Sequence, residues 1–204
     1  YFGKLPVKGW IFMEQTMDRR VRKTRVALRN ALVVLMGEKS IQDINVKELC
    51  ERCDINRSTF YLHYTDVYSL LQQIEADMLA GLEEVLVGFA LPDAPKHGGG
   101  ASPIMRSIFR FLADNADMCR VLLCNNGDMA FVERVKDAVR EKFMREWHSR
   151  MGDAQRGQSE YVYTFIISGC TGILQECLAT GMPKSADDMA QIVENILVSG
   201  VVMG

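Results

Sequence analysis

Apolar side chains recur along this 204-residue chain at intervals of three and four, the spacing of one face of an α-helix. The alternation of apolar and polar residues that marks a half-buried strand is missing, and proline is scarce. The pattern therefore predicts an all-α fold. We expect helices near 18–36, 46–53, 57–64, 67–89, 103–115, 116–124, 129–150, 158–180 and 186–203, with a loop at 91–102.

Two short helices and a tight turn are predicted within the run from Asn45 to Tyr64. Asn45 can cap the first helix, and Glu48 three residues later can return the bond, which is a capping-box pattern. Asp54 then falls in the turn, where aspartate tolerates the left-handed conformation better than most residues. The second helix offers donors, an aromatic ring and an aliphatic group outward. The DNA major groove accepts a helix of that chemistry.

A basic run precedes these two helices, because no acidic residue occurs between Asp18 and Glu38. The net charge of the chain is −2, so only this local concentration argues for a polyanionic partner. A solvated helix face is the alternative, but the neighbouring helix–turn–helix pattern favours phosphate contact. We expect Gly37 to end the helix. Its outward, basic face would hold Arg19, Arg20, Arg22, Lys23, Arg25 and Arg29.

Residues 20–71 resemble the N-terminal domain of the tetracycline-repressor (TetR/AcrR) family of bacterial transcription regulators. The resemblance rests on the stretch VKELCERCDINRSTFYLHYTDVYSLL, which places a helix, a turn, a T-h-Y-x-H-h core and a further helix at the family's spacing. Beyond it the chain is similar only in being helical. The resemblance implies a three-helix DNA-binding domain over 17–72 and an effector-binding and dimerisation domain over 73–204. Residues 1–16 are expected to be an unstructured, tag-like extension, with the native start at Met13 or Met17.

The resemblance also implies that the helix over 57–64 lies in the major groove, held from behind by Phe60 and Tyr64. Arg57 can present a bidentate fork to a guanine edge, and Leu62 would meet a thymine methyl group. The residues expected to contact DNA are Arg19, Arg22, Lys23, Lys47, Arg57, Ser58, Thr59, Tyr61, Leu62 and His63.

Several of these assignments have alternatives. Tyr61 and His63 match the family's phosphate-contacting residues, but they could instead cap or pack against the next helix. Ser58 and Thr59, at the start of the helix, suit either phosphate or base contacts. Lys47 could touch phosphate or a base.

The chain departs from the family's pattern at two positions. Asp54 stands in the turn where the family often has glycine, and Val67 stands where it usually has a phosphate-gripping lysine. One anchoring charge per subunit is therefore missing. A helical interaction module that has lost DNA binding is accordingly a second hypothesis.

The six cysteines are scattered through helical patterns, which favours a reduced, cytoplasmic protein. Cys50 and Cys53 form a CxxC that could pack in the core, act as a redox pair or supply half of a zinc site. Core packing is favoured, because no second cysteine pair or paired histidines follow. No phosphate-cradling glycine loop or nucleophile elbow occurs, so we expect no enzyme, no resident cofactor and no metal.

The C-terminal helices are rich in methionine and aromatic residues, which form either a plain core or, as the resemblance implies, a pocket for a small-molecule effector. Small residues line the penultimate helix at Ser168, Gly169, Gly172 and Ala179. Monomeric packing is one interpretation, but the resemblance favours a homodimer through residues 160–203. Without 18 consecutive apolar residues, no membrane partner is expected. The combined prediction is a ligand-released repressor that binds a near-palindromic operator.

Overall fold

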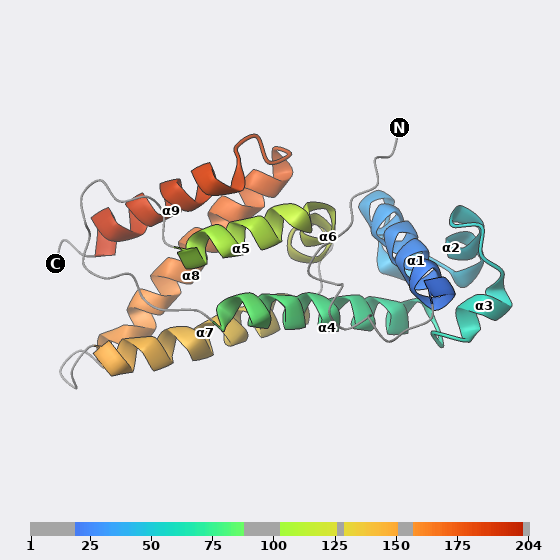
Figure 1. The fold of residues 1–204 in the computed structure, drawn as a ribbon, viewed down its shortest axis with the longest axis horizontal. Coiled ribbons are helices and arrows are strands. Elements are labelled where there is room, and N and C mark those ends of the chain that lie inside the picture. The colour runs from blue at the N-terminus through green and yellow to red at the C-terminus, as the bar shows by residue number, and fades with distance from the viewer. Residues whose placement is uncertain (1–18, 88–102, 126–128, 151–156, 202–204) are drawn as a thin grey trace.

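The computed structural model describes residues 19–87, 103–125, 129–150 and 157–201, in which every regular element is helical (Figure 1). The all-α prediction is confirmed, whereas the predicted extension 1–16 and loop 91–102 lie outside the described residues. The elements are α1 (Arg19–Glu38), η2 (Ile41–Asp43), α2 (Val46–Arg52), α3 (Arg57–Tyr61), α4 (Val67–Leu86), α5 (Pro103–Asp114), α6 (Ala116–Arg120), η3 (Val121–Asn125), α7 (Met129–Arg150), α8 (Ser159–Ala179) and α9 (Ala186–Val201).

One hydrophobic core runs from α1 through α4 to α6, α8 and α9. At its N-terminal end Leu32 of α1, Leu49 of α2 and Phe60 of α3 are all fully buried. The three N-terminal helices α1, α2 and α3, at one end of Figure 1, therefore pack on the same apolar interior as the helices that follow. The core is continuous between the three N-terminal helices and the helices that follow, and α4 contacts both groups.

Helix α4 extends away from the three N-terminal helices and runs beneath α5 (Figure 1). Its first turn is fixed by a capping box, in which Asp66 accepts from the Ser69 N–H at 2.7 Å and Ser69 Oγ lies 3.2 Å from the Asp66 nitrogen. The predicted start of this helix at Val67 is confirmed. Further along, a Cβ at Gly81 would lie 2.8 Å from the Phe111 ring, so glycine permits the close approach of α5.

An ion pair with one buried partner joins α4 to α7. The Glu75 side chain is 4% exposed, and its Oε2 lies 2.6 Å from Nη2 of Arg134. The Arg134 guanidinium also lies 5.6 Å from the centroid of the Phe131 ring. Arg134 is half-exposed, but removing it would leave the buried Glu75 carboxylate without this partner, so the pair holds α7 in a defined position on α4.

The segment after α6 continues as a π-helical turn, η3, where the sequence predicts an uninterrupted helix over 116–124. Two side chains tie this segment to α8. Arg120 Nε donates to the Leu178 carbonyl at 3.0 Å, and Gln175 Nε2 donates to the Leu123 carbonyl at 3.1 Å. These bonds to carbonyl oxygens hold the wider turn against α8.

A second, smaller core lies between α7 and α8, where Phe143 stacks on Trp147 with 5.6 Å between ring centroids. Tyr163 packs beside them and donates its hydroxyl proton to the Lys136 carbonyl at 2.6 Å. Burial raises the pKa of Tyr163 to about 12, which keeps on the hydroxyl the proton that it donates. These aromatic residues serve helix packing in the described structure.

Three predictions about α1 and α3 are wrong. Helix α1 passes through Gly37 and ends at Glu38, because Gly37 keeps a right-handed conformation. Helix α3 ends at Tyr61, earlier than the predicted Tyr64. Arg29, assigned to the basic outer face, is 7% exposed.

Candidate nucleic-acid interface

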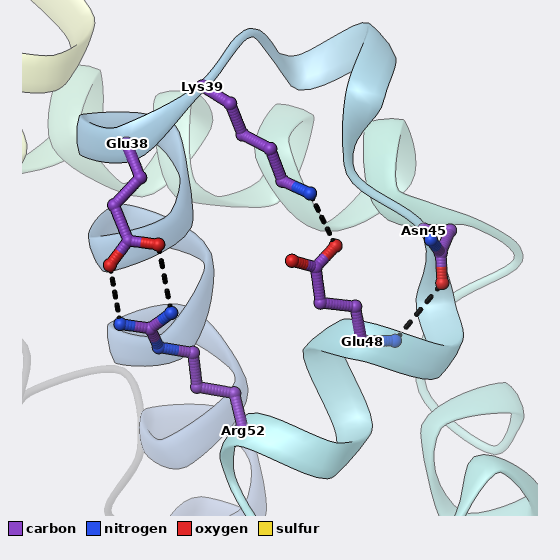
Figure 2. Close-up of polar contacts among 5 residues, drawn as sticks. All are labelled: Glu38, Lys39, Asn45, Glu48 and Arg52. Atoms are coloured by element: carbon purple, nitrogen blue, oxygen red, sulfur yellow. Dashed lines mark hydrogen bonds and ion pairs between the residues drawn. The ribbon is translucent and has the colours of Figure 1, made fainter.

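Helix α2 begins at the predicted cap (Figure 2). The Asn45 side chain accepts from the Glu48 N–H at 3.0 Å, which confirms the first half of the expected capping box. The second half is replaced, because the Glu48 carboxylate instead accepts from Nζ of Lys39 at 2.6 Å. An ion pair to the segment after α1 therefore holds the first turn of α2.

The other end of α2 is held by a bidentate pair. Arg52 donates from Nη1 and Nη2 to the two carboxylate oxygens of Glu38, at 2.9 and 2.6 Å (Figure 2). Exposed pairs contribute little to stability, but a two-bond fork fixes orientation. Helix α2 is thus clamped to the end of α1 at both of its ends.

The turn between α2 and α3 depends on Asp54, whose φ is 53°. The predicted left-handed aspartate is confirmed. It allows the Ile55 N–H to reach back to the Cys50 carbonyl at 3.0 Å, and Asn56 then caps α3. The turn sets the direction in which α3 leaves α2.

Helix α3 has one buried and one exposed face. Phe60 and Tyr64 are buried as predicted, with ring centroids 5.7 Å apart. Tyr61 is 58% exposed although its ring edge rests on Phe60, and Leu62 is 80% exposed. Tyr61 and Leu62, the last residue of α3 and its C-terminal cap, thus form an adjacent pair of exposed apolar side chains.

The structure places most of the predicted DNA-contacting residues on the surface. Two of them, Thr59 and His63, are half-buried. Lys47 and Arg57 line one shallow hollow together with Glu51. The Lys47 ammonium lies 3.9 Å from the Glu51 carboxylate, a neutralising neighbour that the sequence pattern did not identify. The exposed members of the predicted set are Arg19, Arg22, Lys23, Lys47, Arg57, Ser58, Tyr61 and Leu62.

Two arginines of the basic run turn toward the interior. Arg29 donates from Nη2 to the Met118 sulfur of α6 at 3.7 Å, which overturns its assignment to the outer face. Arg25 and Arg29 line a small hollow between α1 and α4 with Asp77. Burial raises the pKa of Asp77, while a hydrogen bond from Gln73 and the two guanidinium groups lower it. The basic surface of α1 is thus confined to its N-terminal half.

Burial, and then the charge of Arg25, lower the pKa of His63 below its usual value. Both effects favour the neutral imidazole in the DNA-free protein.

Val67, the first residue of α4, stands at the position where the family resemblance leads one to expect a phosphate-binding lysine. Val67 is 4% exposed and packs in the core, so a lysine there would need a different path to solvent. The next residue, Tyr68, is 50% exposed. Its hydroxyl is a polar group at this edge that the sequence pattern did not identify.

The CxxC cysteines are divided between core and surface. Cys50 is 3% exposed, as predicted, whereas Cys53 is half-buried at the end of α2 and donates to the Leu49 carbonyl at 3.1 Å. Both thiols are free, and burial raises the pKa of each. Among the described residues, no group of three histidine, cysteine or acidic side chains is placed to hold a metal ion.

We expect the Cys50 thiol to resist alkylation in the native protein. A buried thiol with a raised pKa has little thiolate at pH 8. Labelling with iodoacetamide, read peptide by peptide, should modify Cys53 slowly and Cys50 only after unfolding in urea. Rapid modification of both would support a redox role for the pair.

Helix α8 is unusually apolar for its exposure. By length and composition it is the one described helix that could cross a membrane, yet only 17% of its apolar window is buried. Tyr161 is 79% and Phe165 65% exposed, and a Cβ at Gly169 or Gly172 would meet no atom within 4 Å. One face of α8 therefore lies open in the isolated chain.

Comparisons with known proteins agree with this geometry. Residues 101–199 match the family model TetR_C_8, described as a transcriptional regulator C-terminal region. An uncharacterized HTH-type transcriptional regulator of Bacillus subtilis (strain 168), YxbF, is 36% identical over 70 residues, which are 34% of this chain and 17% of that protein.

Two solved structures share the fold over most of both chains. A TetR transcriptional regulator from Streptococcus agalactiae 2603V has a TM-score of 0.55 and 21% identity, over 88% of this chain and 96% of that one. The fatty acid degradation regulator FadR from Bacillus halodurans has a TM-score of 0.60 and 10% identity, over 92% and 98%. At these identities the likeness establishes the fold alone.

Proposed function

Since this chain belongs to the tetracycline-repressor (TetR) family of transcriptional regulators, we propose that it is a homodimeric, cytoplasmic repressor that binds a near-palindromic operator through α3. The observation that carries the proposal is the division of α3 into two faces. Buried Phe60 anchors the helix while Tyr61 and Leu62 stand out from it. Two such helices would read half-sites about 34–36 Å apart.

The open face of α8 supports the dimer. Exposed aromatic residues beside exposed glycines allow close approach of a second helix, and Ile196 of α9 adds a further exposed apolar side chain. A second copy of the chain would cover this surface by two-fold symmetry. In this proposal the apolar character of α8 serves subunit contact rather than membrane insertion.

A small-molecule effector would act through α4, because that helix contacts both α1 and the C-terminal helices. The Glu75–Arg134 pair couples α4 to α7. A ligand bound among these helices would shift the populations of two arrangements of the dimer and change the spacing of the α3 helices. The proposal leaves the identity of the ligand open.

Arg57→Ala should remove sequence preference in DNA binding. A guanidinium fork on a guanine edge contributes about 1–3 kcal/mol of discrimination. We would select preferred duplexes from a random library with the wild-type protein, and then measure binding of each variant to preferred and scrambled duplexes at several salt concentrations.

Arg22→Ala is the matched control, because it removes the same charge from the exposed start of α1. It should weaken all duplexes alike and reduce the slope of log K against log salt by about 1. Equal effects of the two substitutions would contradict the assignment of Arg57. If the wild-type protein binds no duplex with preference, the chain is a helical interaction module instead.

A further inference from the structure

The N-terminal cap of α3 determines whether the exposed Ser58 hydroxyl can donate or only accept a further hydrogen bond. Oδ1 of Asn56 accepts from the Ser58 backbone N–H at 2.9 Å and lies 3.0 Å from the Ser58 hydroxyl oxygen. The N–H group can only donate, so the oxygen of the Asn56 amide, not its nitrogen, must face Ser58.

Two oxygens 3.0 Å apart form a hydrogen bond only if one of them carries the proton between them. The amide oxygen of Asn56 carries none, so the proton belongs to the Ser58 hydroxyl and points at Asn56. The outward side of the Ser58 oxygen is then left with lone pairs alone. Ser58 is exposed and follows Arg57 on α3.

We propose that Ser58 reads an exocyclic amino group in the major groove. This inference rests on the proposed DNA-binding function and adds to it the class of base that is contacted. Adenine presents its N6 amino group there and cytosine its N4 amino group, whereas guanine and thymine present oxygen acceptors. A hydroxyl that offers only lone pairs accepts from the first two and gains nothing from the others.

The same geometry removes Ser58 from the phosphate contacts. Phosphate oxygens are acceptors, and Ser58 has no proton left for them while the cap is formed. The cap uses only the oxygen of the Asn56 amide, whose two N–H groups are left for an acceptor such as a phosphate. From the sequence alone, Ser58 could contact either a phosphate or a base. The hydrogen bond from the Ser58 hydroxyl to Asn56 favours the base.

The test compares selected operators and base analogues. Random duplexes selected with wild-type protein and with Ser58→Ala should differ at one position per half-site, where the wild type prefers adenine or cytosine. At that position, replacing adenine by purine, or cytosine by pyrimidin-2-one, deletes only the amino group. Wild-type affinity should fall roughly three- to tenfold, the effect of one neutral hydrogen bond, and the affinity of Ser58→Ala should not change.

Two variants of Asn56 separate this role from simple capping. Asn56→Asp keeps an acceptor for the Ser58 hydroxyl and should keep the amino-base preference. Asn56→Gly removes the acceptor, and glycine is tolerated at a helix N-cap nearly as well as asparagine. The freed Ser58 hydroxyl can then donate or accept. The Asn56→Gly variant should therefore still bind DNA but no longer prefer amino bases over keto bases at that position.

Two outcomes would overturn the inference while leaving the DNA-binding function intact. One is a Ser58→Ala profile identical to that of the wild type. The other is a wild-type preference for guanine or thymine at the position that Ser58 controls. If the wild-type protein selects no sequence at all, the proposed function fails, and the inference that rests on it fails too.

Discussion

Phe165→Arg is expected to convert the protein from a dimer to a monomer. The side chain is 65% exposed on the open face of α8, so the substitution leaves the fold of each chain intact. In a two-fold dimer it would place one guanidinium from each copy in an apolar contact, where desolvation and like charge oppose association. Sedimentation analysis of wild type and variant should show the change in mass.

Operator binding should fall with the loss of the dimer, by about 100-fold or more, because two linked reading helices bind with an avidity that a single one lacks. Val87→Arg is the matched control. Val87 is 78% exposed at the C-terminal cap of α4 and is not part of the proposed interface on α8 and α9, so the same substitution there should leave a dimer that binds DNA. A wild-type monomer, or a dimeric Phe165→Arg variant, would contradict the proposed interface.

Phe60→Ala should destabilise the protein by about 3–5 kcal/mol, the usual cost of deleting a buried aromatic ring. Phe60 is fully buried and supports the rings of both Tyr61 and Tyr64. Urea unfolding followed by circular dichroism would measure the loss. DNA binding should also weaken, because the cavity removes the surface on which α3 is seated.

Leu62→Ala, at the C-terminal cap of the same helix, provides the comparison. Leu62 is 80% exposed, so its truncation should change the free energy of unfolding by less than about 0.5 kcal/mol. Its effect should instead fall on DNA affinity, through loss of contact with a thymine methyl group. If Leu62→Ala destabilised the fold as much as Phe60→Ala, the two faces of α3 would be wrongly assigned.

Most of the helix–turn–helix could be predicted because its determinants are local. The cap at Asn45, the left-handed turn at Asp54 and the cap at Asp66 each depend on residues a few positions apart. The burial of Phe60 and Tyr64 also agrees with the helical spacing of the sequence, although α3 itself ends at Tyr61. The residues expected to contact DNA were placed by the same spacing together with the family resemblance, and their contacts with DNA stay predictions.

Other features depended on partners that spacing cannot identify. The sequence spacing predicts that Glu48 completes a capping box, but the Glu48 carboxylate instead accepts from Lys39, which the fold brings beside it. The sequence shows only that Val67 lacks the anchoring charge of a lysine, and the fold adds that its side chain packs in the core. The open face of α8 is likewise defined only when the neighbouring helices are in place.

Arg29 shows most clearly what the sequence determines and what only the tertiary structure decides. The spacing of apolar residues correctly predicts α1 and its apolar stripe, because an i, i+3, i+4 pattern depends only on the geometry of one helix. Whether the next stripe faces water or protein depends on what packs against it. Met118, 89 residues further along the chain, packs against Arg29, and only the tertiary structure brings that residue to α1.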